Sequence, residues 1–300
     1  MSISFKKSVI IVDAPGQMCN RIWSAAAWIS YCNLHNYYII WMGFYEYVSK
    51  FKIKNKNENL YILYGFWPNI LNMYFSKLCV LICRKLQSLD HGFGFLNLIF
   101  TEKSFEYFSN SNKGILIIEG WPSRKPTNSL RHGYKYLSQI FQVNQPPSIS
   151  WSPSSKVKIG VHIRKGDYIN FQGGIFYYED STYIENILYL ISELSIDSES
   201  INIFLSSNSI ISKNNIRDKL SFYVLSSTND SSIDDLFGLS QCDYILGPPS
   251  SFSCWAAFIG NSKLAFITNP HSRVLLKDYQ KISYDDVRDE CRSRVGYWWP

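Results

Sequence analysis

The stretch that decides the fold spans residues 158–168 and reads Lys-Ile-Gly-Val-His-Ile-Arg-Lys-Gly-Asp-Tyr. Residues 158–164 read as a strand in which three of seven side chains, those of Lys158, His162 and Arg164, are ionisable, and residues 165–168 turn away from its end. His162 and Arg164 would lie on the same face of that strand, because side chains two residues apart share a face. Burying ionisable side chains such as those of His162 and Arg164 costs free energy unless a ligand or a partner residue compensates their charge. Open α/β sheets bind ligands at the carboxyl ends of their strands. The stretch therefore predicts an α/β sheet with a binding site after this strand; an ion pair of Arg164 with Asp167 is the alternative.

The rest of the chain alternates strand-like and helix-like runs, which is the pattern of α/β proteins. The predicted strands occupy residues 8–13, 37–41, 114–119, 157–163, 201–206, 221–225, 243–246 and 263–267. The predicted helices occupy residues 18–35, 69–86, 131–143, 181–195, 232–241, 252–260 and 283–294.

The length of 300 residues suits two domains of about 150 residues each. Residues 144–155 hold three prolines among serines, a composition typical of a linker. We therefore expect an N-terminal domain at residues 1–150 and a C-terminal domain at residues 151–300, as two Rossmann-type halves facing each other across a cleft. Within the first domain, residues 42–113 are expected to be an aromatic, basic insertion. Its most apolar part, residues 60–100, would be either a buried helical segment or a surface at a membrane interface.

Charge is unevenly spread along the chain. Residues 1–150 hold 16 Lys and Arg against 7 Asp and Glu, whereas residues 151–300 hold 14 against 17. The basic half predicts an anionic partner, such as a membrane surface, a phosphorylated lipid or nucleic acid, and a merely solvated basic face is the alternative. With 46% hydrophobic and 18% charged residues, the composition excludes a largely disordered chain.

Localisation is predicted from the apolar runs and the cysteines. The sequence has no signal-like leader and no uninterrupted apolar span of about 20 residues. Its seven cysteines are odd in number and form no C-x-x-C pair, which favours a reducing compartment and gives no metal-ligand spacing. We therefore expect a cytoplasmic protein without a metal site, with peripheral contact at the inner membrane.

Two further turns carry chemistry. Residues 246–257 run from a strand through Gly-Pro-Pro into a serine-rich helix start, where hydroxyls and free N–H groups can bind an anion; a plain N-cap is the alternative. Residues 13–21 join the first strand to a helix and place Arg21 in its first turn. A cation there opposes the helix dipole, which points to an anion as its partner.

These stretches resemble the α-1,2-fucosyltransferases and, more broadly, the superfamily that includes the α-1,6- and protein O-fucosyltransferases. Four ordered blocks across about residues 9–260 carry the resemblance. Residues 162–168 are similar to the family's H-x-R-x-x-D-Y motif, and residues 16–21 are similar to its G-x-x-x-N-[QR] turn. Residues 119–123 are similar to its G-[YW]-x-Q-S stretch, and residues 135–137 to the K-Y-F that follows it. Residues 234–243 are similar to its D-L-x-L-M-S-x-C-x stretch, and residues 250–257 to its N-S-S-F-S-W-W-A-A ending.

The resemblance implies a GT-B-like α/β fold, GDP-fucose as donor, no metal, and inversion at the anomeric carbon. Arg164 would hold the β-phosphate, and the other donor-side residues would be His162, Asp167, Ser250, Ser251 and Phe252. Ser207 and Asn208 stand where the family carries an acidic pair, beside the donor's base. The acceptor side would hold Asn20, Arg21, Glu119 and Trp121.

We thus expect a metal-independent, inverting glycosyltransferase that moves fucose to a hydroxyl of a glycan in α-1,2 linkage, during synthesis of a surface polysaccharide or another glycan. The acceptor would be free or lipid-linked, and no nucleic-acid partner is expected. Asp13 and Glu119 are the two candidates for the base, each with a turn cap or an ion pair as the alternative. The alternative functions are transfer from another nucleotide sugar, or sugar or nucleotide binding with weak turnover.

Overall fold

A computed structural model of the chain describes residues 7–55, 59–62, 74–75, 77–78, 81–82, 85, 96–98, 102–111, 114–119, 129–227 and 231–282. The chain divides into two compact units, Met1–Asn144 and Gln145–Pro300. The division falls at the start of the proline- and serine-rich stretch from which the sequence places the boundary. The expected helix at 283–294 lies outside the described residues, as does most of the one at 69–86.

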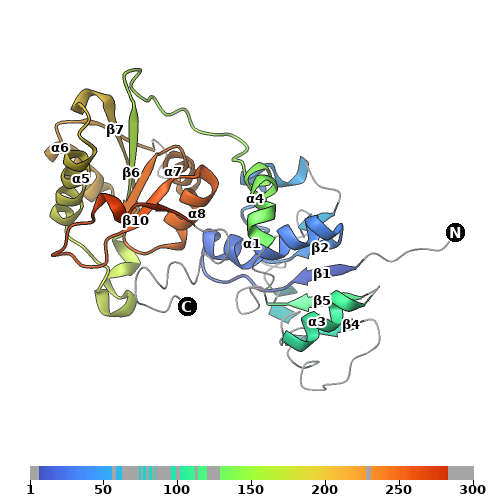
Figure 1. Cartoon of the computed structure of the whole chain (residues 1–300). Coiled ribbons are helices and arrows are strands. Elements are labelled where there is room, and N and C mark those ends of the chain that lie inside the picture. Colours follow the sequence, from blue (N-terminus) through green and yellow to red (C-terminus); the bar gives the residue numbers. More distant parts are fainter. Residues whose placement is uncertain are drawn as a thin grey trace. The chain divides into compact units, whose positions relative to one another are not determined.

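The N-terminal unit holds a five-stranded sheet whose described pairings are all parallel. Its strands, in the order β3-β2-β1-β5-β4, are β1 (Ser8–Ile11), β2 (Tyr38–Trp41), β3 (Leu60–Ile62), β4 (Leu96–Leu98) and β5 (Ile115–Ile118). Figure 1 shows α1 (Met18–His35) and α4 (Ser129–Ile140) together on one side of this sheet, and α3 (Glu102–Asn110) on the other. The short helices η1 (Val48–Lys50) and η2 (Lys52–Asn55) follow β2.

Several described residues of the stretch 42–113 belong to this sheet and its core. The stretch supplies the edge strands β3 and β4, and its residues Phe44, Val48 and Phe51 are buried in the core of the unit. The reason is packing: Phe44 stacks on Trp41 at the end of β2, with ring centroids 4.2 Å apart. Farther along the same stretch, the described side chains of Tyr74, Phe75 and Leu78 are exposed.

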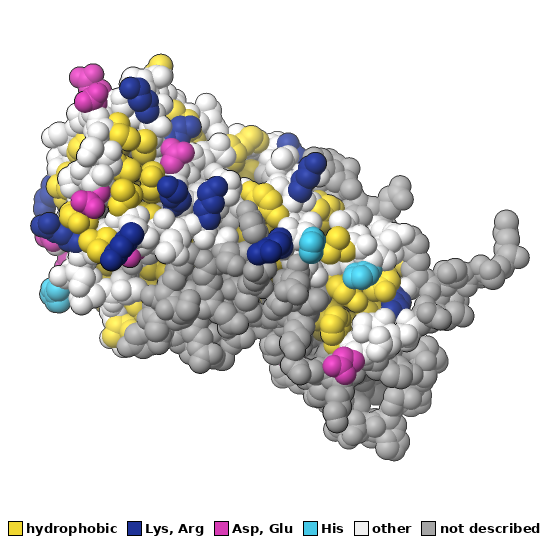
Figure 2. Space-filling view, viewed as in Figure 1, with side chains coloured by type: hydrophobic (Ala, Val, Ile, Leu, Met, Phe, Trp, Pro, Cys, Tyr) yellow, Lys and Arg dark blue, Asp and Glu magenta, His cyan; other side chains and the backbone are white. Residues whose placement is uncertain are grey.

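The surface of the N-terminal unit carries a set of cations on and beside α4. Arg131, His132 and Lys135 lie on the exposed side of α4, and Lys50 is exposed at the end of η1. Figure 2 shows Lys, Arg and His side chains on the visible face of this unit. Within the described ranges, no helix is long and apolar enough to cross a membrane.

The C-terminal unit is a doubly wound sheet of six strands in the order β11-β10-β9-β6-β7-β8. The strands are β6 (Val157–Ile163), β7 (Ile201–Ser207), β8 (Tyr223–Ser226), β9 (Tyr244–Gly247), β10 (Lys263–Phe266) and β11 (Gln280–Lys281), of which only β11 pairs antiparallel among the described pairings. In Figure 1, α5 (Asp180–Leu194) and α6 (Ile210–Lys219) lie on one side of the sheet, and α7 (Ser232–Ser240) and α8 (Ser251–Gly260) on the other. The 3-10 helices are η3 (Gly166–Ile169), η4 (Phe171–Gly174), η5 (Ser198–Ser200) and η6 (Leu276–Asp278).

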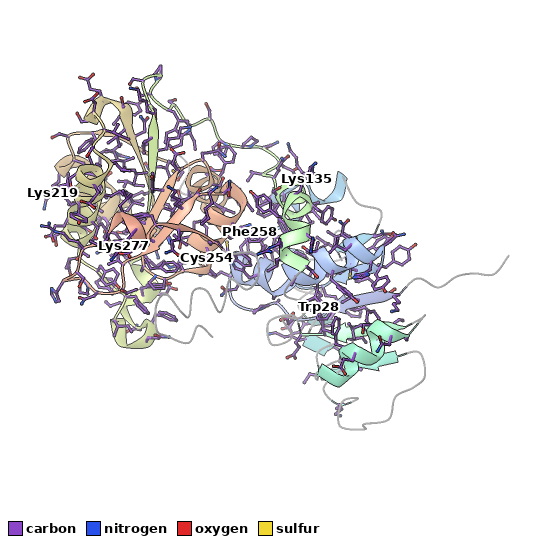
Figure 3. The ribbon with its side chains drawn as sticks, viewed as in Figure 1. Trp28, Lys135, Lys219, Cys254, Phe258 and Lys277 are labelled. Atoms are coloured by element: carbon purple, nitrogen blue, oxygen red, sulfur yellow. The ribbon has the colours of Figure 1, made fainter. Side chains whose placement is uncertain are left out.

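The two central strands are buried on both faces. Every residue of β7 is buried, and so are the last five of β6, because helices cover both faces of a parallel sheet. The helix α8 is buried on several sides; Figure 3 labels two of its core residues, Cys254 and Phe258. The sheet is thereby fixed rigidly beneath the loops at its carboxyl edge.

Candidate functional site

The carboxyl edge of the C-terminal sheet brings three of the predicted segments together. β6 pairs with β7 on one side, with Ile163 opposite Ser207, and with β9 on the other, with Val161 opposite Leu246. The chain leaves β6 toward β7 and β8, and later returns to the opposite side of β6 as β9 and β10. This is a topological switch point, where open α/β sheets bind their ligands in the crevice beyond the strand ends.

Arg164 follows β6 directly at this crevice. Its guanidinium pairs with Asp167, with Nη2 2.9 Å from Oδ2, and its Cζ atom lies 5.4 Å from the ring centroid of Tyr168. The Arg164 side chain is 17% exposed and that of Asp167 55%. The predicted ion pair therefore exists, but solvent weakens such a half-exposed pair, so its net contribution to stability is small. A guanidinium held at the crevice can also form two charge-assisted hydrogen bonds to a phosphate.

His162 is the last residue but one of β6 and is 3% exposed. Its ring packs against that of Phe252, with centroids 5.1 Å apart, and its backbone is so close to Gly247 that a Cβ there would lie 2.4 Å from the His162 carbonyl oxygen. Burial, and secondarily the charge of Arg164, lower the pKa of His162 to about 3. The imidazole is neutral at physiological pH, and among the residues that the structure describes its Nδ1 atom has no hydrogen-bond partner. A buried ring nitrogen of this kind is available to a bound ligand.

The pKa of His162 gives a testable dependence of stability on pH. Because the pKa falls from 6.5 in the unfolded chain to about 3 in the folded one, the unfolded state binds the extra proton between these values. The contribution of His162 to the free energy of unfolding is thus complete above pH 6.5 and should decrease, as the pH falls, by up to about 1.4 kcal/mol for each pH unit.

Urea unfolding at several pH values should show a shallower decrease in the free energy of unfolding for His162→Asn than for the wild type. The exposed residue His132 supplies the control, since His132→Asn should keep the wild-type slope; equal slopes in all three proteins would contradict this account.

The start of α8 forms the opposite side of the crevice. Ser250 caps the helix, accepting a hydrogen bond from the Phe252 N–H at 3.2 Å, and the Ser253 hydroxyl donates to the Ser250 carbonyl at 3.1 Å. Ser250 is therefore an N-cap residue, as the alternative interpretation of this turn expected. Ser251 and Phe252 occupy the first turn of α8. A helix start next to an arginine suits a negatively charged group.

The predicted residues at the end of β7 contact the backbone in this structure. The Asn208 Oδ1 atom accepts the Lys165 N–H at 3.0 Å, and the Ser207 hydroxyl accepts the Ser209 N–H at 3.0 Å. Gly166, with φ at +39°, passes so close that a Cβ there would lie 2.6 Å from the Asn208 Nδ2 atom. Asn208 thus holds the turn that carries Arg164 and Asp167.

A buried carboxylate beside these residues is missing from the residues predicted for the site. Asp235, in the first turn of α7, accepts the Ser206 hydroxyl at 3.0 Å and the Ser227 hydroxyl at 2.5 Å. Burial raises its pKa, while these two hydrogen bonds and the charge of Lys213 lower it. Asp235 therefore lies across the carboxyl ends of β7 and β8 with an orientation fixed by its partners.

In the N-terminal unit, the predicted carboxylates follow neighbouring strands. Asp13 comes shortly after β1 and Glu119 directly after β5, and these two strands pair in register with Ile11 opposite Ile118. Both carboxylates are therefore at one edge of the sheet, and Trp121 lies outside the described residues.

The start of α1 lies at the same edge and carries Asn20 and Arg21. The Arg21 guanidinium pairs with Glu46 at 2.8 Å and donates to the Gly43 carbonyl at 3.0 Å. The anion that meets Arg21 in this structure is thus a side chain of the same unit. The Asn20 Oδ1 atom is buried and has no hydrogen-bond partner among the described residues.

Metal ligands are not grouped in the part of the chain that the structure describes: no cluster of three or more His, Cys, Asp or Glu side chains could hold an ion there.

Known proteins resemble this chain in sequence and in fold. Residues 152–284 match the family model described as "Glycosyl transferase family 11". No curated protein matches the chain. Among solved structures, a variant of Arabidopsis thaliana FUT1 in complex with GDP is similar at a TM-score of 0.55 and 13% identity, over 92% of this chain and 73% of that one.

Two further matches have lower scores. POFUT1 in complex with GDP-fucose has a TM-score of 0.48 and 10% identity, over 89% of this chain and 99% of that one. The fucosyltransferase NodZ from Bradyrhizobium has a TM-score of 0.44 and 12% identity, over 89% and 97%. The likeness to the Arabidopsis structure confirms the expected α/β, GT-B-like fold class.

Proposed function

We propose that the chain is a glycosyltransferase that transfers fucose from GDP-fucose to a hydroxyl group of a glycan, because residues 152–284 match the model of glycosyl transferase family 11. The C-terminal unit would bind the nucleotide sugar, and the N-terminal unit would bind the acceptor. The family match, together with the GDP in the Arabidopsis structure, supports the nature of the donor.

The observation that carries the proposal is the carboxyl edge of the sheet at β6 and β9. It joins the Arg164 guanidinium, the neutral buried ring of His162 and the start of α8 at one strand edge. A diphosphate matches this set, because the guanidinium and the helix start favour its charge and the imidazole offers a fixed hydrogen-bonding group.

Asp235 supports guanine as the base of the donor. Guanine presents two adjacent N–H donors, and a carboxylate can accept both. Ser207 and Asn208 offer no such acceptor pair, but the carboxylate of Asp235 lies behind Ser206 at the same edge. The Ser206 and Ser227 hydroxyls would hold it for this contact.

In the reaction, the acceptor oxygen would attack the anomeric carbon of fucose while the bond from that carbon to the diphosphate oxygen breaks, with inversion of configuration. Negative charge grows on the departing GDP, where Arg164 and the start of α8 would stabilise it without a metal ion. The acceptor hydroxyl would lose its proton to a carboxylate, for which Asp13 and Glu119 are the candidates.

The experiment follows GDP released from GDP-fucose with the acceptor present and absent. We expect turnover in excess EDTA equal to that in added manganese, and a product whose new linkage is α-1,2. Activity that EDTA abolishes and manganese restores would contradict the metal-independent mechanism. Release of GDP without any glycosidic product would contradict transfer.

The acceptor would be a growing surface glycan, free or lipid-linked, and the cations on α4 and at Lys50 support contact with an anionic membrane surface. Cosedimentation with vesicles should increase with their content of anionic lipid. Replacing Lys50 and Lys135 by Gln should reduce this binding, and binding independent of lipid charge would contradict it.

A further inference from the structure

Tyr168 joins the two loops that form the crevice. It lies in η3, directly after the loop that carries Arg164, and is 5% exposed. Its phenol donates a hydrogen bond of 2.6 Å to the carbonyl oxygen of Pro249, in the loop between β9 and α8. Burial raises the pKa of Tyr168 to about 12, although the charge of Arg164 and a hydrogen bond with the Ser250 side chain lower it. The phenol is therefore neutral and bound to the α8 cap.

The ring of the same residue contacts Arg164. The guanidinium Cζ atom lies 5.4 Å from the ring centroid, a distance at which the ring face attracts a cation. The other contacts hold the ring in place: it stacks on Phe171 at 5.1 Å, and the Tyr168 N–H donates to the Lys165 carbonyl at 2.8 Å. One rigid side chain thus touches the guanidinium at its face and the helix cap at its hydroxyl.

We propose that Tyr168 is a positioning residue, which sets the spacing between the Arg164 guanidinium and the start of α8 so that both meet one diphosphate. The inference rests on the proposed function, since it assigns a role within the donor site. The physical reason is that a diphosphate spans a fixed distance, and groups that must bind both its ends need matching separation before it arrives. A phenylalanine would fill the same space and contact Arg164, but it would not hold the β9–α8 loop.

Tyr178 supplies a matched control. It is 1% exposed, and its phenol donates to the carbonyl oxygen of Ile267 at 2.7 Å. Tyr168→Phe and Tyr178→Phe each remove a buried hydrogen bond from a phenol to a backbone carbonyl of the same unit, and both should lower the Tm. Only the first removes a link between the two loops of the crevice.

The test measures the affinity of the whole chain for inorganic pyrophosphate, GDP and guanosine by calorimetry. Tyr168→Phe should bind pyrophosphate and GDP about tenfold more weakly, because misplaced charge-assisted bonds lose energy of this order, and should bind guanosine unchanged. Its kcat should decrease by a similar factor, whereas Tyr178→Phe should match the wild type in all three affinities.

Equal pyrophosphate affinity in the two variants would overturn the inference. A loss of guanosine binding as large as the loss of pyrophosphate binding would also overturn the inference, because it would indicate general damage to the protein. A wild-type protein that binds no pyrophosphate would overturn it as well. Pyrophosphate binding that depends on Tyr168, in a protein that does not turn over GDP-fucose, would contradict the proposed function and leave this role of Tyr168 intact.

Discussion

Replacing Arg164 by alanine should lower the rate of transfer at least about a hundredfold, the effect of removing one preorganised group that stabilises charge in a transition state. The guanidinium follows β6 at the switch point, where the departing diphosphate would accumulate charge. Since this interaction strengthens as the sugar–oxygen bond breaks, the loss should appear mainly in kcat. Arg164→Lys should recover only part of the rate, because one ammonium cannot reproduce the two bonds of the guanidinium.

The alternative role of Arg164, as the ion-pair partner of Asp167, predicts a different result. The pair is half-exposed on the Asp167 side, so it stabilises the fold little, and Asp167→Asn gives its contribution to the Tm directly. Tm and kcat should be measured on the same preparations of both variants. A lower Tm for Arg164→Ala, with near wild-type transfer by the folded fraction, would contradict the role in donor binding.

Asp235→Asn should raise the KM for GDP-fucose about ten- to a hundredfold, because a hydrogen bond to a charged group contributes about 1.5–3 kcal/mol. An amide in place of the carboxylate would also present a donor to the guanine N–H groups. Inhibition by GDP and by inosine diphosphate, which lacks the guanine amino group, isolates the contact with the base. The wild type should prefer GDP, and Asp235→Asn should lose that preference.

The control for this variant is the adjacent carboxylate, Asp234, in the same turn of α7. Asp234→Asn should retain both the KM and the preference for GDP. A KM that rises equally in the two variants, or an Asp235→Asn protein that still distinguishes GDP from inosine diphosphate, would show that another group contacts the base. Circular dichroism of each variant separates these outcomes from loss of fold, since Asp235 is buried.

The sequence predicts the central elements closely, and their burial explains why. Predicted and observed bounds agree for β6 at residues 157–163 and for α1 at residues 18–35. β6 has strand neighbours on both sides and buries its last five residues, four of which are Ile, Gly or Val. α1 is buried over most of its length and ends where Asn36 adopts a left-handed conformation, which Asn tolerates well.

Elements without an apolar pattern could not be predicted in this way. α6 has exposed isoleucines at positions 210 and 211, and its only buried hydrophobic residue is Ile216, so its sequence has no apolar stripe. The strands β3 and β4 are three residues long, too short for a period to be visible. Their place in the sheet depends on pairing with β2 and β5 rather than on their own residues.

The grouping of the candidate residues could be predicted from the sequence where one loop carries them, but not where segments distant in the sequence meet. His162, Arg164 and Asp167 lie within six residues of sequence, and the structure keeps them at one strand end. Asp235 accepts hydrogen bonds from Ser206 and Ser227, 29 and 8 residues away, and no spacing rule connects the three. The only sequence signal for Asp235 is its position in the block that resembles the fucosyltransferases.

The most direct test of the central claim is turnover of a panel of nucleotide sugars by the purified chain, with GDP-fucose, GDP-mannose, UDP-glucose and UDP-galactose as donors. The crevice with Arg164, together with the carboxylate of Asp235, predicts that GDP-fucose is consumed fastest and that GDP inhibits more strongly than UDP. Faster turnover of a UDP-sugar would contradict the guanine assignment. Binding of GDP-fucose without turnover of any donor in the panel, with acceptor glycans supplied, would contradict the claim that this chain transfers fucose.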